Sequence, residues 1–281
     1  MGSWLEDGIP IGRWLEQLVE LLKQHPFLFD RMEWVIKNLS QAFEWFLFLW
    51  PEWLLIIILA LPVLIFKRRW GLFVFILVGL ALIWNLGYWE NMVYTLSLVL
   101  TAALISIIVG IPTGIIAAKS RLIHNVITPI LDFMQTMPAF VYLIPAVFFF
   151  GIGTVPGVVA SVIFSMPPVI RLTILGIQQV PVDIIEAADA FGSTSLQKLM
   201  KVQLPLAKQT IMAGVNQTIM LALSMVVIAS MIGARGLGRD VYQAVTQNNM
   251  GAGFEAGLCI VVLAILLDRI TQLMSRPTAK N

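Results

Sequence analysis

The chain contains seven long runs of apolar residues, and so many runs of this length do not fit into a soluble fold. They lie near residues 53–66, 70–87, 92–118, 125–150, 156–178, 209–233 and 254–273. A helix needs about 20 mostly apolar residues to cross a bilayer, where it satisfies its own backbone hydrogen bonds. Charged residues make up 12% of the chain, against about 25% in a soluble domain. The pattern predicts an all-α, polytopic transmembrane helical bundle of about seven spans.

The first two runs are short for complete spans, so the exact number of helices within 45–90 stays open. We expect the run at 53–66 either to include residues 46–50 or to cross a thinned bilayer. The net charge of +2 is too balanced for a nucleic-acid partner. His25 and His124 are isolated and Cys259 lies in an apolar run, so the sequence predicts no metal site.

Basic residues in the connections between the runs predict an orientation. Cytoplasmic connections carry an excess of Lys and Arg. The larger basic group alternates onto one side of the membrane and consists of Lys67, Arg68, Arg69, Lys119, Arg121, Lys198, Lys201, Lys208, Arg269, Arg276 and Lys280. We therefore expect an N-terminus outside and a C-terminus in the cytoplasm. An aromatic belt then falls at the outer interface, formed by Trp50, Trp53, Trp84, Tyr88 and Trp89.

Residues 1–50 are predicted to form an extracytoplasmic amphipathic segment. Apolar residues recur there at helical spacing between Met32 and Phe46, with charged residues on the opposite face. Such a helix either lies on the outer leaflet or packs against the bundle. Residues 51–90 are expected to supply accessory transmembrane helices, and residues 274–281 a cytoplasmic tail.

The segment 179–208 is too polar for a membrane span and is predicted to be a cytoplasmic loop of two short helices. Pro181 suits the start of the first helix, and Gly192 suits the left-handed position at its end. Residues 193–195 offer N-caps for the second helix, which Pro205 is expected to close. The exposed apolar face of the first helix is typical of a docking surface for another protein.

The same segment resembles the coupling motif of ABC importer permeases. The matching residues, at the spacing of that motif, are Glu186, Ala187, Ala188, Gly192, Leu204 and Pro205. Further stretches at 132–145, 155–161 and 164–168 look like the permease subunit of glycine betaine/proline importers, and the resemblance covers about residues 85–273. The turn at 233–238 is similar to an outer loop of the family, although Arg235 stands where a smaller residue or proline is expected.

The resemblance implies a type I ABC importer permease fold, with residues 91–273 as the core permease domain and 179–208 as its coupling loop. It implies a bacterial cytoplasmic membrane, a homodimer of permeases, two ATPase subunits and an extracytoplasmic substrate-binding protein. The expected function is ATP-driven import of glycine betaine/proline-type solutes for osmoprotection. The chain has no phosphate-binding loop motif, so ATP and Mg are expected on the partner ATPase, with no catalytic residue or cofactor on this chain.

Polar side chains at membrane depth offer a candidate translocation path. They belong to the runs at 125–150 and 209–233 and are Gln135, Thr136, Pro138, Tyr142, Asn216, Gln217 and Ser224. Ordinary interhelical hydrogen bonding explains them equally well. Aromatic rings at 140–150 offer either a cage for a quaternary ammonium or plain packing.

Asp132 and Arg171 are predicted to form an ion pair. Each lies on the order of 10 Å inside the inner end of its run, at about 1.5 Å per residue. Breaking a buried pair costs about 3–5 kcal/mol, so we expect single neutralisation to be worse than double neutralisation.

Two other classes of function remain open at this point. An ion-coupled secondary transporter or channel for a small zwitterionic solute typically shows internal repeats and charged residues deep in its helices. The chain shows no clear repeat and few central charges. A membrane-embedded enzyme would need a catalytic constellation, and the sequence offers none that we recognise.

Overall fold

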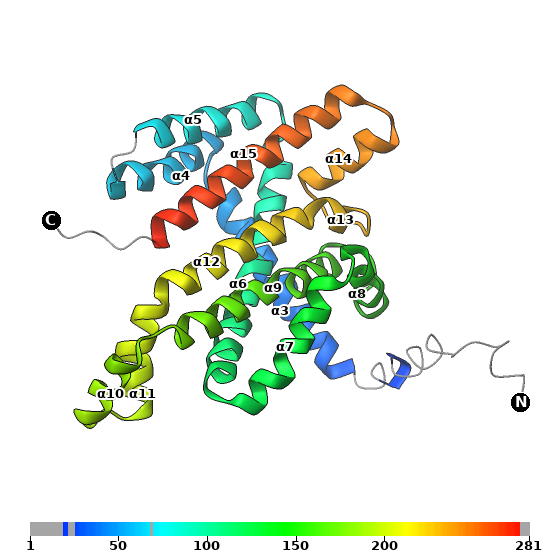
Figure 1. Cartoon of the computed structure of the whole chain (residues 1–281). Coiled ribbons are helices and arrows are strands. Elements are labelled where there is room, and N and C mark those ends of the chain that lie inside the picture. Colours follow the sequence, from blue (N-terminus) through cyan, green and yellow to red (C-terminus); the bar gives the residue numbers. More distant parts are fainter. Residues whose placement is uncertain (1–18, 22–25, 68–69, 276–281) are drawn as a thin grey trace, which may run out of the picture.

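The computed structural model describes residues 19–21, 26–67 and 70–275, and the regular structure in these ranges is helical (Figure 1). This confirms the predicted all-α class. The helices are α3 (Pro26–Phe48), α4 (Glu52–Lys67), α5 (Trp70–Asn85), α6 (Trp89–Lys119), α7 (Arg121–Thr136), the 3₁₀ helix η1 (Ala139–Tyr142), α8 (Leu143–Phe150), α9 (Thr154–Gln178), α10 (Val182–Ala190), α11 (Ser195–Lys198), the π-helical turn η2 (Leu199–Gln203), α12 (Leu204–Ser224), α13 (Val226–Ser230), α14 (Leu237–Thr246) and α15 (Met250–Ser275).

The core is formed where α9 packs between α6 and α12. Small residues let the helices approach closely, as is usual for helices in a membrane. Gly114 of α6 faces Thr173 of α9 so closely that a Cβ at Gly114 would lie 2.6 Å from the Thr173 Cβ. The Ser106 and Ser165 hydroxyls lie 3.3 Å apart across the same interface, so these two buried groups are partners of each other. Packing of small and hydroxyl-bearing residues therefore holds the centre of the bundle together.

Each predicted apolar run corresponds to a helix or a bent helix pair of the structure. Among the described residues, four helices are long and apolar enough to cross a membrane, or up to six spans if each of two bent helix pairs counts as one. The run at 125–150 is one such pair, because α7 and the helix after it meet at 109° around Pro138. Proline disfavours a helical conformation in the residue before it and lacks an N–H donor, so the helix ends there.

The second bent pair corrects the expected start of the first span. Residues 46–48 belong to α3 rather than to the helix at 53–66, and α4 leaves α3 at 100° after Pro51. The 16-residue helix α5 is apolar but short.

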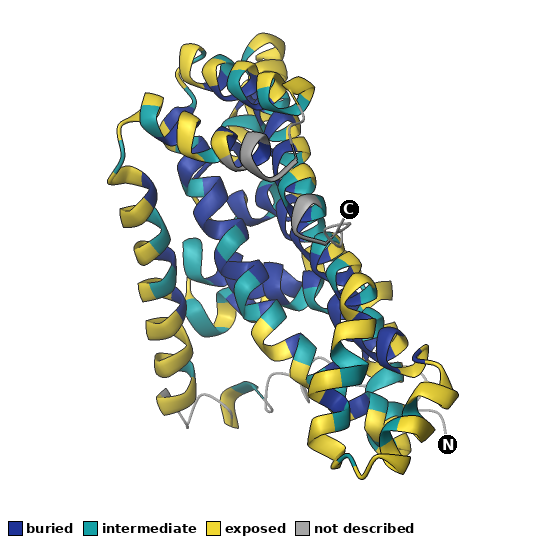
Figure 2. Cartoon of the chain, turned by 90° about the vertical axis from the view of Figure 1, so that its left-hand side faces the viewer, coloured by how far each residue is buried: buried dark blue, intermediate teal, exposed yellow. Residues whose placement is uncertain are grey.

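Helix α3 packs against the bundle, which is one of the two arrangements predicted for an amphipathic N-terminal segment. The Ser97 hydroxyl of α6 donates to the Ser40 carbonyl at 2.9 Å, and Phe29 stacks on Phe149 of α8 at a centroid distance of 4.3 Å. The opposite face of α3 is exposed and carries Trp34 and Trp45 (Figure 2). Residues 1–18 and 22–25 of the predicted segment lie outside the described residues.

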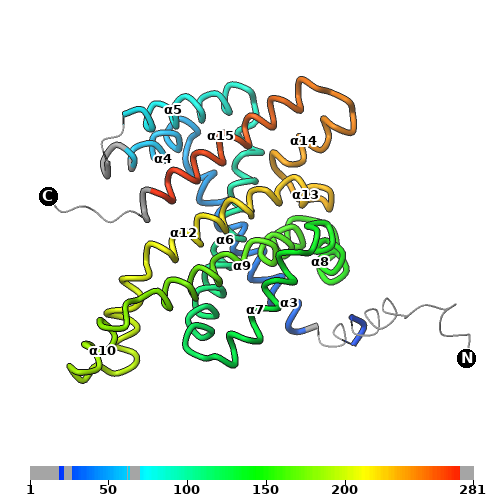
Figure 3. Tube along the Cα trace, viewed as in Figure 1, coloured from blue at the N-terminus to red at the C-terminus, as the bar shows by residue number. Residues whose placement is uncertain are grey.

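The short helices α10 and α11 connect the end of α9 to the start of α12, and they lie at one end of the bundle (Figure 1). The chain path runs down α9 to α10 and α11 and returns along α12 to the turn after α13 (Figure 3). The Gly153 N–H, just before α9, donates to the Ile232 carbonyl at 2.8 Å. We call the end with α10 and α11 the coupling end and the end with Gly153 and Ile232 the distal end.

Candidate coupling segment and polar groups of the bundle

The segment 179–208 has most of the local structure that its sequence predicts. Helix α10 begins directly after Pro181, and Gly192 adopts a φ of +74° after the helix ends. The Thr194 hydroxyl accepts a hydrogen bond from the Gln197 N–H at 3.3 Å, and the Gln197 side chain accepts one from the Thr194 N–H at 2.9 Å. This capping box starts α11 as expected from the cap-forming residues 193–195.

An ion pair that sequence reasoning missed fixes α10 against α11. The Lys198 Nζ lies 2.6 and 2.7 Å from the two Asp189 carboxylate oxygens, across the turn at Gly192. Opposite charges on either side of a helix-ending glycine were the available signal. The pair and the capping box together hold the two helices of the coupling segment at a defined angle.

Most of the surface of α10 is exposed. None of its nine described residues is buried. Phe191 is 91% exposed and Val182 67% exposed, beside the exposed Glu186 and Ala187. Ala188 is half-buried. An apolar surface of this kind, rimmed by polar residues, marks an interaction site.

The sequence predicted that Pro205 ends the second helix of the coupling segment, and this prediction is wrong. The chain stays helical from Ser195 to Ser230, passing through the π-helical turn at Leu199–Gln203. Pro205 stands in the first turn of α12, where its missing N–H is tolerated because the wider turn before it interrupts the regular ladder. Half-buried Leu204 packs on Ile177 and Leu199. The coupling segment is therefore continuous with a candidate membrane span.

The residues predicted for a translocation path do not all come together. Gln135 and Thr136 are exposed at the end of α7, and Pro138 caps η1 at the bend. Gln217 and Ser224, seven residues apart, share an exposed stripe of α12. Tyr142 is buried and donates its hydroxyl to the Met134 carbonyl, which makes it part of the packing at the bend.

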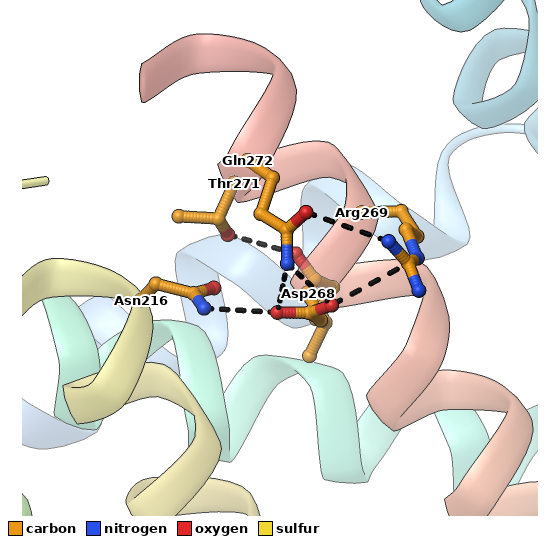
Figure 4. A network of polar contacts seen from close by, with 6 residues as sticks. Asn216, Asp268, Arg269, Thr271 and Gln272 are labelled. Carbon is orange, nitrogen blue, oxygen red and sulfur yellow. Dashed lines mark hydrogen bonds and ion pairs between the residues drawn. The ribbon is translucent and has the colours of Figure 1, made fainter. Parts of the chain in front are cut away.

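Asn216 joins two helices through a polar network. Its side-chain amide donates to the Asp268 carboxylate of α15 at 2.9 Å, and Gln272 donates to both oxygens of the same carboxylate at 2.9 Å (Figure 4). Asp268 was not predicted, although a single acidic residue near the end of the run at 254–273 was the available signal. The network is the interhelical bonding that the sequence left as an alternative.

The aromatic rings at 140–150 are used for packing. Phe149 and Phe150 contact Phe29 of α3, at centroid distances of 4.3 and 6.0 Å. The Tyr142 ring packs edge-on against Phe164 at 6.3 Å. These contacts hold α3 and α9 against the α8 region and favour packing over a cage.

Asp132 and Arg171 form an ion pair between α7 and α9, but the pair is not buried. One Nη of Arg171 contacts the Asp132 carboxylate, and the two side chains are 38% and 59% exposed for Arg171 and Asp132. The expected burial is wrong for the single chain because α7 lies at its edge, with Leu131 as the one residue of that helix that is buried. The Arg171 Nε has no hydrogen-bond partner among the described residues.

We predict that neutralising one member of this pair is worse than neutralising both. Asp132→Asn leaves a lone guanidinium, and Arg171→Gln leaves a lone carboxylate; each should lower the free energy of unfolding by on the order of 1 kcal/mol. The double variant should recover part of that loss. Unfolding in lipid nanodiscs measures all three. A double variant no more stable than the weaker single variant would show that the pair contributes nothing.

Comparison with known proteins gives a consistent result. Residues 110–280 match the family described as "Binding-protein-dependent transport system inner membrane component". The chain is 57% identical to the glycine betaine/carnitine transport permease protein GbuB of Listeria monocytogenes serotype 1/2a (strain 10403S), over 95% of this chain and 96% of that protein. It is 63% identical to the glycine betaine transport system permease protein OpuAB of Bacillus subtilis (strain 168), over 79% of this chain and 78% of that protein.

Two further matches extend the comparison. The glycine betaine/proline betaine transport system permease protein ProW of Escherichia coli (strain K12) is 48% identical over 95% of this chain and 76% of that protein. Among solved structures, a chain of the inward-facing MetNI methionine ABC transporter superposes with a TM-score of 0.62 at 21% identity, over 67% of this chain and 96% of that chain. This likeness shows the fold, which is the type I ABC importer permease fold expected from the sequence.

Proposed function

Because the chain belongs to the family of binding-protein-dependent transport system inner membrane components, we propose that it is the permease subunit of an ATP-driven importer for glycine betaine and related zwitterionic solutes. The names of its relatives support this substrate class. The chain is a multi-pass membrane component, and the family is one of transport rather than catalysis. A dependence on binding proteins argues against the ion-coupled alternative.

The observation that carries the proposal is the coupling segment. Its first helix exposes Glu186 and Ala187 together with unpartnered apolar residues, and its second helix continues into α12 without a break. We propose that Glu186, Ala187, Ala188 and Gly192 dock an ATPase subunit, with the Glu186 carboxylate accepting hydrogen bonds from basic groups of that partner. Movement of the ATPase would then reach α12 through the junction at Leu204 and Pro205.

In the proposed assembly, each end of the bundle faces a different partner. The coupling end would face the cytoplasm and the distal end a substrate-binding protein, with the N-terminus outside and the C-terminus inside. ATP and Mg would bind the two ATPase subunits and not this chain. A second permease would complete the path, since the stripe with Gln217 and Ser224 is exposed in the single chain. Residues 51–90 would act as accessory helices to the core permease domain at 91–273.

Reconstitution tests the substrate class. We expect vesicles with the permease, its ATPase and its binding protein to accumulate labelled glycine betaine when ATP is supplied, and more so at high external osmolarity. The reason is the exposed stripe of α12, where the Gln217 amide and the Ser224 hydroxyl suit a small, net neutral solute better than an ion. The control is the same vesicles without ATP. Accumulation of a sugar or a peptide, with no uptake of betaine, would contradict the assignment.

A further inference from the structure

A second site lies at the corner between α3 and α4, beside the connection from α5 to α6. A cavity of about 740 Å³ opens there. The lining residues that matter chemically are Phe48, Trp50, Trp84, Trp89, Glu52 and Glu90. Helix α6 starts at this corner, and its other end, around Ile115 and Ala118, packs near the coupling segment. The cavity therefore belongs to the distal end of α6.

The walls of this cavity are aromatic and its only charged groups are acidic. Trp89 is 7% exposed and belongs to the main hydrophobic core, whereas Trp84 is 46% exposed. Trp50 is half-buried, and Glu52 and Glu90 are exposed. None of the described residues that line the cavity is Lys, Arg or His. Neither carboxylate forms an ion pair with any part of the chain that the structure describes.

Hydrogen bonds and a ring contact hold the segments that line the cavity. The Pro51 carbonyl accepts hydrogen bonds from the N–H groups of Leu54 and Leu55, at 2.9 and 3.0 Å, which fixes the start of α4. The Tyr94 hydroxyl donates to the Glu90 carboxylate at 3.1 Å, and the Tyr94 ring packs edge-on against Phe48 at 5.6 Å. These contacts connect one acidic group and one aromatic wall through a single tyrosine.

We propose that this cavity binds a quaternary ammonium group. Indole faces attract such a cation through their negative π-surfaces, and the attraction grows when the cation is desolvated. A methylated ammonium has no N–H to donate, so it loses little by leaving water for an aromatic wall. Glu52 and Glu90 supply the compensating charge at the rim. Interfacial anchoring explains exposed Trp84 alone, but it does not require two carboxylates without an ion-pair partner among the described residues beside it.

The inference does not depend on transport, because it concerns equilibrium binding to the permease itself. The bound group can come from a free solute or from a choline lipid headgroup, since both present the same trimethylammonium. A free zwitterion would have to direct its own carboxylate away from the two acidic side chains, toward the open side of the cavity. We therefore expect choline to bind more tightly here than glycine betaine.

Labelled choline and the full chain in detergent micelles test the proposal by equilibrium dialysis. We expect saturable binding that Trp84→Leu weakens at least fivefold. Trp34→Leu is the matched control, because Trp34 is 63% exposed on α3 and does not line the cavity. The uncharged isostere 3,3-dimethylbutan-1-ol should compete at least tenfold less well than choline. If Trp84→Leu does not fold, the double variant Glu52→Gln/Glu90→Gln should show a similar loss of binding.

Three results would overturn the proposed binding of a quaternary ammonium group. Equal binding by the Trp84→Leu and Trp34→Leu chains, or equal competition by the neutral isostere, would overturn the proposal. Absence of saturable choline binding would overturn it as well. Nanodiscs then identify the source of the group. Choline binding that is lost in phosphatidylcholine discs but kept in phosphatidylglycerol discs supports a lipid headgroup, and binding kept in both supports a free solute.

Discussion

Replacing Gly192 by valine should reduce solute-stimulated ATP hydrolysis about tenfold or more, while the permease still inserts into the membrane. Gly192 has a φ of +74°, where an L-residue costs roughly 1–2 kcal/mol and a β-branched residue is the least tolerated. About 1.4 kcal/mol corresponds to a factor of ten. A Cβ at this position would meet nothing within 4 Å, so the expected loss comes from the backbone conformation and not from a clash. ATP turnover in proteoliposomes, with pull-down of the ATPase, measures it.

Gly192→Asn is the control that separates conformation from contact. Asparagine tolerates the left-handed region, and Asn248 of this chain already adopts a φ of 54°. We expect the Asn variant to keep most of the coupled hydrolysis. If Val and Asn are equally inactive, a side chain at this exposed position blocks docking and the conformational explanation is wrong. If Val is as active as glycine, the turn is not needed for coupling.

The coupling segment was predictable because its signals are local. A proline that starts a helix, a glycine that ends one and a threonine that caps the next each act over a few residues. Pro181, Gly192 and Thr194 therefore have in the structure the roles that their order in the sequence indicates. The exposure of α10 also followed, since a polar loop in a membrane protein has few apolar surfaces to pack on.

The effect of a proline inside an apolar run was harder to predict. Pro138 ends α7 at a sharp bend, whereas Pro205 lies within a continuous helix and Pro112 lies inside α6. The residue type is the same in all three places. What differs is whether neighbouring turns can supply the missing hydrogen bond or loosen the ladder, as the π-helical turn does before Pro205. That information is tertiary, so the sequence did not predict which of these prolines bends its helix.

Contacts between helices that are far apart in the sequence were also not predicted. The hydrogen bond from Asn216 to Asp268 joins residues 52 apart, and no local pattern indicates which helices are neighbours. The aromatic residues show the same limit. Phe149 and Phe150 are adjacent in the sequence and pack on Phe29 of α3, whereas Trp50 lies far in the sequence from Trp84 and Trp89 and lines the same cavity. Composition predicts a belt of tryptophans, but only the fold places them around a common space.

Replacing Gly114 by leucine should separate α6 from α9 and is expected to cost about 3 kcal/mol or more. Extra volume in a well-packed core costs about 1–3 kcal/mol when side chains can move aside, and more when they cannot. A Cβ at Gly114 would lie 2.6 Å from the Thr173 Cβ and 2.9 Å from the Ile170 carbonyl oxygen. The oxygen belongs to the α9 backbone, so a change of rotamer cannot relieve the contact and the whole helix has to move.

Gly257→Leu is the matched control, because Gly257 also lies in a long apolar helix, α15, but a Cβ there would meet nothing within 4 Å. Leucine favours a helix over glycine by about 0.8 kcal/mol, so the control should be as stable as the parent chain or slightly more stable. Thermal unfolding and gel filtration of both variants in the same detergent measure the difference. If the Gly114 variant unfolds at the temperature of the control and elutes as one symmetric peak, the close approach of α6 to α9 does not hold the bundle together. If it unfolds well below the control and aggregates, that approach is what keeps α12, and with it the coupling segment, in place.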